Sequence, residues 1–270
     1  MEQTLGLMCG AGTLPARMAG EARRQGWRVV AFAFEGASDL AAHADRVFPS
    51  RIGEMGPVIA GLGEERVAAV ALSGRFSMPA LLRVEAADAT HARIAAAAGA
   101  LVDDNLTAAL EGTLASLGIE FLDQRRLLGD WLVPSGCRSA RAPSEHEWED
   151  VRRGLAVARL VADARVGQTV VVRRGAVSAV EAVEGTTDAV RRGVALAGPG
   201  AVVVKVAARR HDFRFDVPAV GPDTLDAAAA GGAAVVAVEA GRVLVLDLEE
   251  TIARADRARI AFVSVDAESA

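Results

Sequence analysis

Charged side chains gather in one segment of an otherwise apolar chain, 205–232 (KVAARRHDFRFDVPAVGPDTLDAAAAGG). If this segment is extended, Asp212, Arg214 and Asp216 share one face, because side chains alternate along a strand, and the two intervening phenylalanines point the other way. Carboxylates are ligands for Mg²⁺, and arginine binds phosphate oxygens. The spacing therefore fits a site for a metal and a phosphate, and it fits a structural ion network of the same residues almost equally well.

Polar residues also interrupt the apolar stretches of the second half. Lys205 lies inside VVVKVA, and burying an unpaired ammonium is costly, so we expect it to reach the surface or to have an anionic partner. Gln168 begins a hydrophobic strand, and Glu181 and Glu184 bracket two apolar residues. The GTTD that follows leads into a helix, and its threonines also suit an ordinary helix cap.

The N-terminal glycine turn, GAGTLP, lies between a predicted strand and a predicted helix, where backbone N–H groups can hold phosphate. Glu35 ends the second predicted strand, where a dinucleotide fold often places a ribose-binding acid. Pro15, however, stands where the nicotinamide fingerprint has its third glycine, so a nicotinamide-dependent oxidoreductase is poorly supported. A tight turn without a ligand explains Gly10 and Gly12 at least as well.

Two further polar clusters, 73–75 and 103–105, follow predicted strands. Open α/β sheets bind ligands at the carboxyl edge of their strands, which makes Asp103 a candidate substrate contact. Asp103 and Asp104 also suit the cap of the helix predicted over 107–117.

The order of elements places these residues in two α/β domains. Buried strands over 4–9, 27–34, 67–73, 100–104 and 119–123 alternate with helices such as 15–25, which predicts a parallel, Rossmann-like sheet. Residues 124–150 are a connector, and Ser144 is expected to open a helix. The second half contains a predicted hairpin over 167–184, a strand over 201–208, a second hairpin or a strand pair over 233–247 that turns at Gly241 and Arg242, and a closing helix and strand. We expect a domain over 1–128, a linker over 129–143, and a mixed α/β domain over 144–270 that carries the catalytic residues.

The composition is typical of a folded cytoplasmic protein. Of the 270 residues, 51% are hydrophobic and 24% charged, and the net charge of −5 gives no basic field that would attract nucleic acid. Cys9 and Cys137 alone cannot build a disulfide framework or a zinc site. No apolar run approaches the ~18 residues of a membrane span, and the N-terminus does not read as a signal peptide.

Long motifs then carry a resemblance: GQTVVV, VEAVEGTTDAVRRG, VVVKV, HDFRFDVPAVGPDTL and AVEAG in the second half, and GLMCGAGTLP, SGRFSMPALL and VDDNLTAALEGTLASLGIEFLD in the first. In this order they resemble the LpxI family, the UDP-2,3-diacylglucosamine pyrophosphatases of lipid A biosynthesis. The resemblance implies a two-domain, homodimeric enzyme that uses Mg²⁺, with Mn²⁺ as a substitute. It implies a cytoplasmic protein in peripheral contact with the inner membrane of Gram-negative bacteria, which releases UMP and 2,3-diacylglucosamine 1-phosphate by water attack at the α-phosphorus.

The same resemblance assigns roles to residues of this sequence. The catalytic residues it implies are Asp216, Asp212, Arg214 and Lys205, and the metal ligands are Asp216, Asp212, Glu181 and Asp188. The substrate contacts it implies are Gly10, Gly12, Leu14, Pro15, Asp103, Gln168, Glu184, Gly185, Thr186, Thr187, Gly221, Asp223 and Thr224.

Three departures from the family pattern bear on activity. Thr187 stands where the family has an acid, so Asp188 would have to take its place, and His211 stands where a glutamine is usual. The N-terminal turn has GAG in place of a run of glycines. The alternative function is therefore a divergent homologue that binds a nucleotide-sugar lipid without hydrolysing it, or that uses a different substrate.

Overall fold

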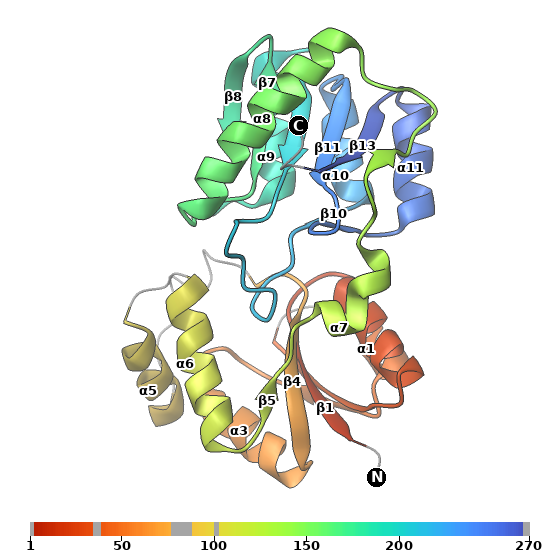
Figure 1. The fold of residues 1–270 in the computed structure, drawn as a ribbon. Helices are drawn as coiled ribbons and strands as arrows, with labels where there is room; N and C mark the ends of the chain where they lie inside the picture. The colour runs from red at the N-terminus through yellow and green to blue at the C-terminus, as the bar shows by residue number, and fades with distance from the viewer. Residues whose placement is uncertain (1–2, 35–38, 77–87, 100–102, 267–270) are drawn as a thin grey trace. The chain divides into compact units, whose positions relative to one another are not determined.

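A computed structural model describes residues 3–34, 39–76, 88–99 and 103–266 of the chain (Figure 1). The chain divides into two compact units. The first comprises Met1–Gly129 and Asp212–Asp216, and the second comprises Asp130–His211 and Val217–Ala270. The fold is α/β in both units, as the alternation of strands and helices predicts.

The first unit is built on a five-stranded parallel sheet of order β3-β2-β1-β4-β5. Its strands are β1 (Thr4–Cys9), β2 (Arg28–Ala33), β3 (Arg46–Pro49), β4 (Val67–Ser73) and β5 (Glu120–Phe121). Its helices are α1 (Leu14–Arg24), α2 (Leu40–His43), α3 (Met55–Glu64), α5 (Ala89–Ala98), α6 (Asp103–Ser116) and α7 (Arg125–Leu128), followed by the 3₁₀ helix η1 (Gly129–Trp131). This strand order is the Rossmann order 3-2-1-4-5-6 without its sixth strand, with the topological switch between β1 and β4.

Burial explains why the central strand forms. Every residue of β1 is buried, which a strand covered on both faces requires. Cys9, the last residue of β1, is 0% exposed, and burial raises the pKa of its thiol. Cys9 is therefore a packing residue, as expected from its place in the strand.

Two expectations for the first unit are revised. The strand predicted over 100–104 is wrong at its end, because Asp103 already begins α6; residues 100–102 lie outside the described part of the chain. β3 and α3 were not predicted, since RVFP is too short for a clear alternating pattern.

The second unit is built on a mixed sheet of order β6-β13-β11-β9-β7-β8, in which β9, β11 and β13 are parallel. Its strands are β6 (Gly136–Cys137), β7 (Thr169–Arg173), β8 (Ala176–Val180), β9 (Val202–Lys205), β11 (Val235–Glu239) and β13 (Ala261–Val265). A separate parallel pair joins β10 (Ala219–Val220) to β12 (Leu244–Val245). The helices are α8 (Glu145–Asp163), α9 (Thr186–Ala197), α10 (Pro222–Ala230) and α11 (Leu248–Arg257).

Alternate residues of the same strands pack on opposite faces of this sheet. In β9, Val203 belongs to the core cluster that includes α9 and α10, whereas Val202 and Val204 belong to the cluster beneath α8. This period of two places helices on both faces. Lys205 is the last residue of β9, at the carboxyl edge of the parallel strands.

The first predicted hairpin is confirmed. β7 and β8 are antiparallel, and Arg174 and Gly175 at their turn have φ values of 49° and 77°. Asp150 of α8 fixes this turn by accepting hydrogen bonds from both of these backbone N–H groups, at 2.7 and 2.6 Å. Left-handed φ at both central residues is the geometry that a two-residue hairpin favours.

Of the two alternatives predicted for 233–247, the structure contains a pair of strands, β11 and β12, and not a hairpin. β11 pairs in parallel with β9 and β13, whereas β12 pairs in parallel with β10 in another sheet. Two apolar runs separated by a glycine turn indicate two strands but do not specify which partners they take. The cap of α8 is confirmed: Ser144 Oγ accepts from Glu147 N, and Glu147 Oε2 accepts from Ser144 N at 2.8 Å. Among the described residues, no helix is both long enough and apolar enough to cross a membrane.

Candidate active site

The segment 212–216 is a turn, so the extended conformation that would place Asp212, Arg214 and Asp216 on one face is not present. Backbone N–H groups of Phe215 and Asp216 approach Asp212 O at 3.2 and 3.4 Å, and Arg214 N donates to Asp212 Oδ1 at 3.0 Å. An aspartate that accepts from the N–H two residues on is a common way to close a turn. Side chains therefore do not alternate along this segment, but Asp212, Arg214 and Asp216 remain within one turn.

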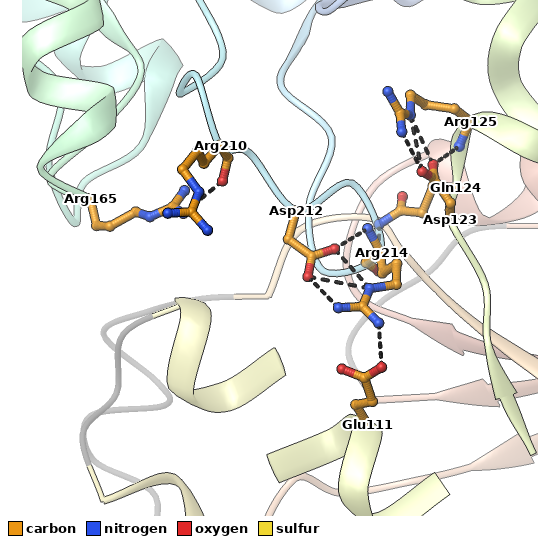
Figure 2. Close-up of polar contacts among 8 residues, drawn as sticks. All are labelled: Glu111, Asp123, Gln124, Arg125, Arg165, Arg210, Asp212 and Arg214. Carbon is orange, nitrogen blue, oxygen red and sulfur yellow. Dashed lines mark hydrogen bonds and ion pairs between the residues drawn. The ribbon is translucent and has the colours of Figure 1, made fainter. Parts of the chain in front are cut away.

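Arg214 joins two carboxylates at this turn (Figure 2). Its guanidinium donates to Asp212 Oδ2 at 2.7 Å and to Glu111 Oε1 of α6 at 2.6 Å. These hydrogen bonds, first that of Asp212 and then that of Glu111, raise the pKa of Arg214. The three side chains remain 30%, 28% and 50% exposed for Arg214, Asp212 and Glu111. The expected Asp212–Arg214 contact exists, whereas the contact of Arg214 with Glu111 was not predicted from the sequence.

The turn is anchored on the first unit by its aromatic residues and its backbone. Phe213 is 3% exposed and lies under the guanidinium of Arg125, 4.1 Å from the ring centroid. Phe215 packs against the core cluster of β1, β2 and β4. Gln124, itself buried, donates from its backbone to Phe213 O at 3.2 Å and from its side chain to Arg214 O at 3.3 Å. Phe213 and Phe215 therefore anchor the turn by burial, although the segment is not extended.

Lys205 has the anionic partner that its burial requires. Its side chain is 4% exposed, and Nζ lies 3.5 Å from Glu181 Oε2, whose side chain is 10% exposed. Lys205 Nζ also donates to Thr186 Oγ1 at 2.6 Å, and Thr186 Oγ1 donates to Glu181 Oε1 at 2.7 Å. The backbone N–H of Gln168 completes the contacts to this carboxylate at 3.2 Å.

The charge of Glu181 is maintained by these contacts. Burial acts to raise its pKa, but the charge of Lys205 and the hydroxyls of Thr169 and Thr186 outweigh burial, so the pKa is lowered overall. Thr186 is the first residue of α9 and follows Gly185, whose φ of 84° places it in the left-handed region. The structure thus brings together Lys205, Glu181, Thr186 and Gln168 of the predicted set.

The remaining predicted residues near α9 have local partners. Glu184 accepts from Arg192 at 2.5 Å, and Asp188 pairs with Arg191 one turn along the helix. Thr187 is half-buried in the first turn of α9. Within the described residues, no group of three or more histidine, cysteine or acidic side chains is gathered as a metal cage.

The candidates at α10 lie at the beginning of that helix. Gly221 precedes it, Asp223 lies in its first turn, and Thr224 is 5% exposed. Asp103 begins α6, and its side chain lies outside the described part of the structure.

The N-terminal turn is held against the end of β4. Ala11 and Arg75 exchange backbone hydrogen bonds of 2.9 Å in each direction. A Cβ on Gly10 would come within 2.5 Å of Arg75 O, so glycine is needed there for close backbone approach. Leu14 and Pro15 open α1. Glu35, the candidate ribose ligand, lies outside the described residues.

A shallow cavity of about 350 Å³ lies at the carboxyl ends of β2 and β3, between Phe32, Phe48 and Glu54. None of the predicted site residues lines it. Two buried charged residues of the second unit, Arg159 and Glu239, also escaped prediction. Glu239 could have been found by the reasoning applied to Lys205, because it too ends a run of buried apolar residues.

Comparison with known proteins covers both units. The LpxI N-terminal domain family matches residues 4–131, and the LpxI C-terminal domain family matches residues 134–263. A protein of Caulobacter vibrioides named UDP-2,3-diacylglucosamine pyrophosphatase LpxI is 29% identical in an alignment of 272 positions that covers 97% of each chain.

Likenesses to solved structures are slight. N5-carboxyaminoimidazole synthetase from Staphylococcus aureus is 12% identical with a TM-score of 0.27. The match covers 64% of this chain and 40% of the synthetase chain. Glycinamide-RNase-transformylase T from Mycobacterium tuberculosis is 13% identical with a TM-score of 0.25. The match covers 73% of this chain and 44% of the transformylase chain. These values are too low to bear on fold or function.

Proposed function

This chain belongs to the LpxI family, and on that premise we propose that it hydrolyses the pyrophosphate bond of UDP-2,3-diacylglucosamine. The observation that carries the proposal is the match of both family domains, in order, over nearly the whole chain. The Caulobacter relative, named for this activity, supports it over 97% of its length. The products are UMP and 2,3-diacylglucosamine 1-phosphate.

The turn at 212–216 supplies the groups that this reaction needs. Cleavage of a phosphoric anhydride requires a positioned water and neutralisation of charge on the phosphate oxygens. Asp216 orients the water, which attacks the α-phosphorus as the bond to the bridging oxygen breaks. Arg214, whose guanidinium is 30% exposed, binds phosphate oxygens.

Lys205 acts differently from Arg214 in this proposal. It is buried, and its ammonium contacts Glu181 and the hydroxyl of Thr186. We assign to it the orientation of Thr186 at the beginning of α9, where that hydroxyl and the adjoining backbone contact the substrate. Gln168, Glu184, Gly185 and Thr187 remain proposed contacts around the same helix end.

Mg²⁺ fits the chemistry of the turn. This ion is commonly held by one or two carboxylates together with substrate phosphates and water, so a cage of three acids is not required. Asp212 and Asp216 would hold it, with Mn²⁺ as a substitute. Like Asp212, which pairs with Arg214, Glu181 and Asp188 each contact a cationic side chain. The ion would supply positive charge beside the phosphate oxygens.

The test is UMP release from UDP-2,3-diacylglucosamine by purified protein with Mg²⁺, run in ¹⁸O-water. We expect the label in UMP, because attack at the α-phosphorus leaves the bridging oxygen on the sugar phosphate. Asp212→Ala and Asp216→Ala should each lower turnover about 100-fold or more while circular dichroism shows an intact fold.

Each part of the proposal fails separately in this test. Label in the sugar phosphate would place the attack at the other phosphorus, and undiminished turnover in both variants would refute the site. Tight binding of the substrate without turnover in the wild type would favour the alternative, a nucleotide-sugar-lipid binding protein. That alternative is suggested by Thr187, which stands where the family has an acid.

A further inference from the structure

The segment 206–211, between Lys205 and Asp212, is held by side chains along most of its length. Ala207 N donates to Glu239 Oε2 at 2.9 Å, and Arg159 donates to Ala207 O. Arg242 donates to Ala208 O at 2.5 Å. Backbone groups that follow the end of a strand are thus satisfied by charged side chains in place of a neighbouring strand.

The second half of the segment is held by α8 and the residues that follow it. Asp163 Oδ1 accepts from Arg209 N at 2.7 Å, and Arg165 donates to Arg210 O at 2.9 Å (Figure 2). His211 N turns back to donate to Ala208 O at 3.1 Å. The segment is therefore fixed on the second unit up to the residue before Asp212.

Glu239 is the centre of this arrangement. The residue is 4% exposed at the end of β11, and its Oε1 accepts from Arg159 at 2.6 Å and lies 3.3 Å from Arg242 Nε. Its other oxygen binds Ala207 N, so one carboxylate connects β11, α8 and the segment. A buried carboxylate with two guanidinium partners is fully compensated, whereas a neutral residue would leave charged partners unpaired.

We propose that Glu239 is a positioning residue for the hydrolysis, which acts by fixing the segment 206–211 that leads into the Asp212–Asp216 turn. This rests on the proposed function, which assigns the chemistry to that turn. The six residues of the segment connect Lys205 to Asp212. Asp212 follows the segment directly in the chain, and small misplacements of reacting groups are costly in rate.

The test compares Glu239→Gln with Glu65→Gln in the full chain. Glu65 is a matched control in the first unit: its side chain is 7% exposed and also pairs with two arginines, Arg28 and Arg46. We expect Glu239→Gln to lower kcat about 10–100-fold with a smaller change in KM, as for residues that orient a catalytic group. Glu65→Gln should retain the kcat of the wild type.

Amide hydrogen exchange provides a readout independent of catalysis. Exchange at 206–211 should accelerate in Glu239→Gln, most at Ala207, and stay at the wild-type rate in Glu65→Gln. If Glu239→Gln does not fold, Arg242→Met replaces it, since Arg242 is 31% exposed and holds the same segment; a loss of kcat in the same direction is expected.

The outcomes separate this proposal from the proposed function. An active wild type with unchanged kcat in Glu239→Gln, or in Arg242→Met when that variant replaces it, overturns the positioning role. Unchanged exchange at 206–211 overturns it even if the wild type proves inactive. An equal loss of kcat in Glu65→Gln shows a general effect of breaking buried ion pairs and overturns it as well. An inactive wild type alone refutes the proposed function.

Discussion

Two groups of charged residues are centred on Lys205 and Arg214, which lie on either side of the 206–211 segment in the chain, and the groups differ in exposure. Around Lys205 the side chains of Lys205 and Glu181 are 4% and 10% exposed. Around Arg214 the side chains of Arg214, Asp212 and Glu111 are 28–50% exposed. Each group pairs a cationic side chain with carboxylate, but of the two groups only the second presents charge to solvent.

The difference separates a structural contribution from a chemical one. A buried ion pair loses much stability when one partner is removed, because the other charge remains in an apolar environment. An exposed pair contributes little, since water screens it in either state. The Lys205 group is therefore expected to hold the second unit together, and the Arg214 group to be available to a substrate.

The largest expected effect comes from Lys205→Met. Removing the ammonium leaves Glu181 buried with only hydroxyl and N–H partners, at a cost of about 3–5 kcal/mol in the free energy of unfolding. Arg214→Met, the matched control, should cost about 0–1 kcal/mol. Urea unfolding followed by circular dichroism measures both, and equal losses would contradict the division between the two groups.

A smaller effect is expected at Thr186. Its hydroxyl accepts from Lys205 and donates to Glu181, so Thr186→Val leaves both partners underbonded and should cost about 1–3 kcal/mol. Thr187→Val is the matched control, because it replaces a hydroxyl by a methyl group at the next residue of the same helix turn. We expect it to stay within about 0.5 kcal/mol of the wild type, as ordinary substitutions do. If Thr187→Val lost more stability than Thr186→Val, Thr187, the residue that departs from the family pattern, would have the structural role that we assign to Thr186.

The sequence predicted the features that depend on local patterns. The β7–β8 hairpin, the cap at Ser144 and the burial of Cys9 each follow from a few neighbouring residues. The ionic partner of Lys205 could be expected because an unpaired buried ammonium is unfavourable, although the partner itself, Glu181, could not be chosen from the spacing.

What could not be predicted depends on residues distant in the chain. Glu111 meets Arg214 across a separation of 103 residues, and Glu239 meets Arg159 across 80. Alternation of charged and aromatic residues at 212–216 is compatible with a strand and with a turn. The structure has the turn, in which Asp212 Oδ1 accepts a hydrogen bond from Arg214 N. The family resemblance identified the turn as important without giving its shape.

The last expected effect is a change in the acid sensitivity of the second unit. The folded-state pKa of Glu181 is lowered, burial being outweighed by Lys205 and two hydroxyls, so the unfolded chain binds more protons between the two pKa values. The stability from this charge is fully present above the unfolded value of about 4.3 and is lost as pH falls through the folded pKa.

Glu181→Gln cannot gain this stability at any pH. The variant should be less stable than the wild type at pH 7, and the difference should narrow as pH falls below about 4.3, as measured by Tm across the acid range. Glu54→Gln, at an exposed pair with Arg51, should follow the wild-type curve. A difference in Tm between Glu181→Gln and wild type that stays constant down to low pH would show that the Glu181 carboxylate stabilises the fold through its shape and hydrogen bonds. In that case the charge of Glu181 would not explain the contrast between the buried group and the exposed group.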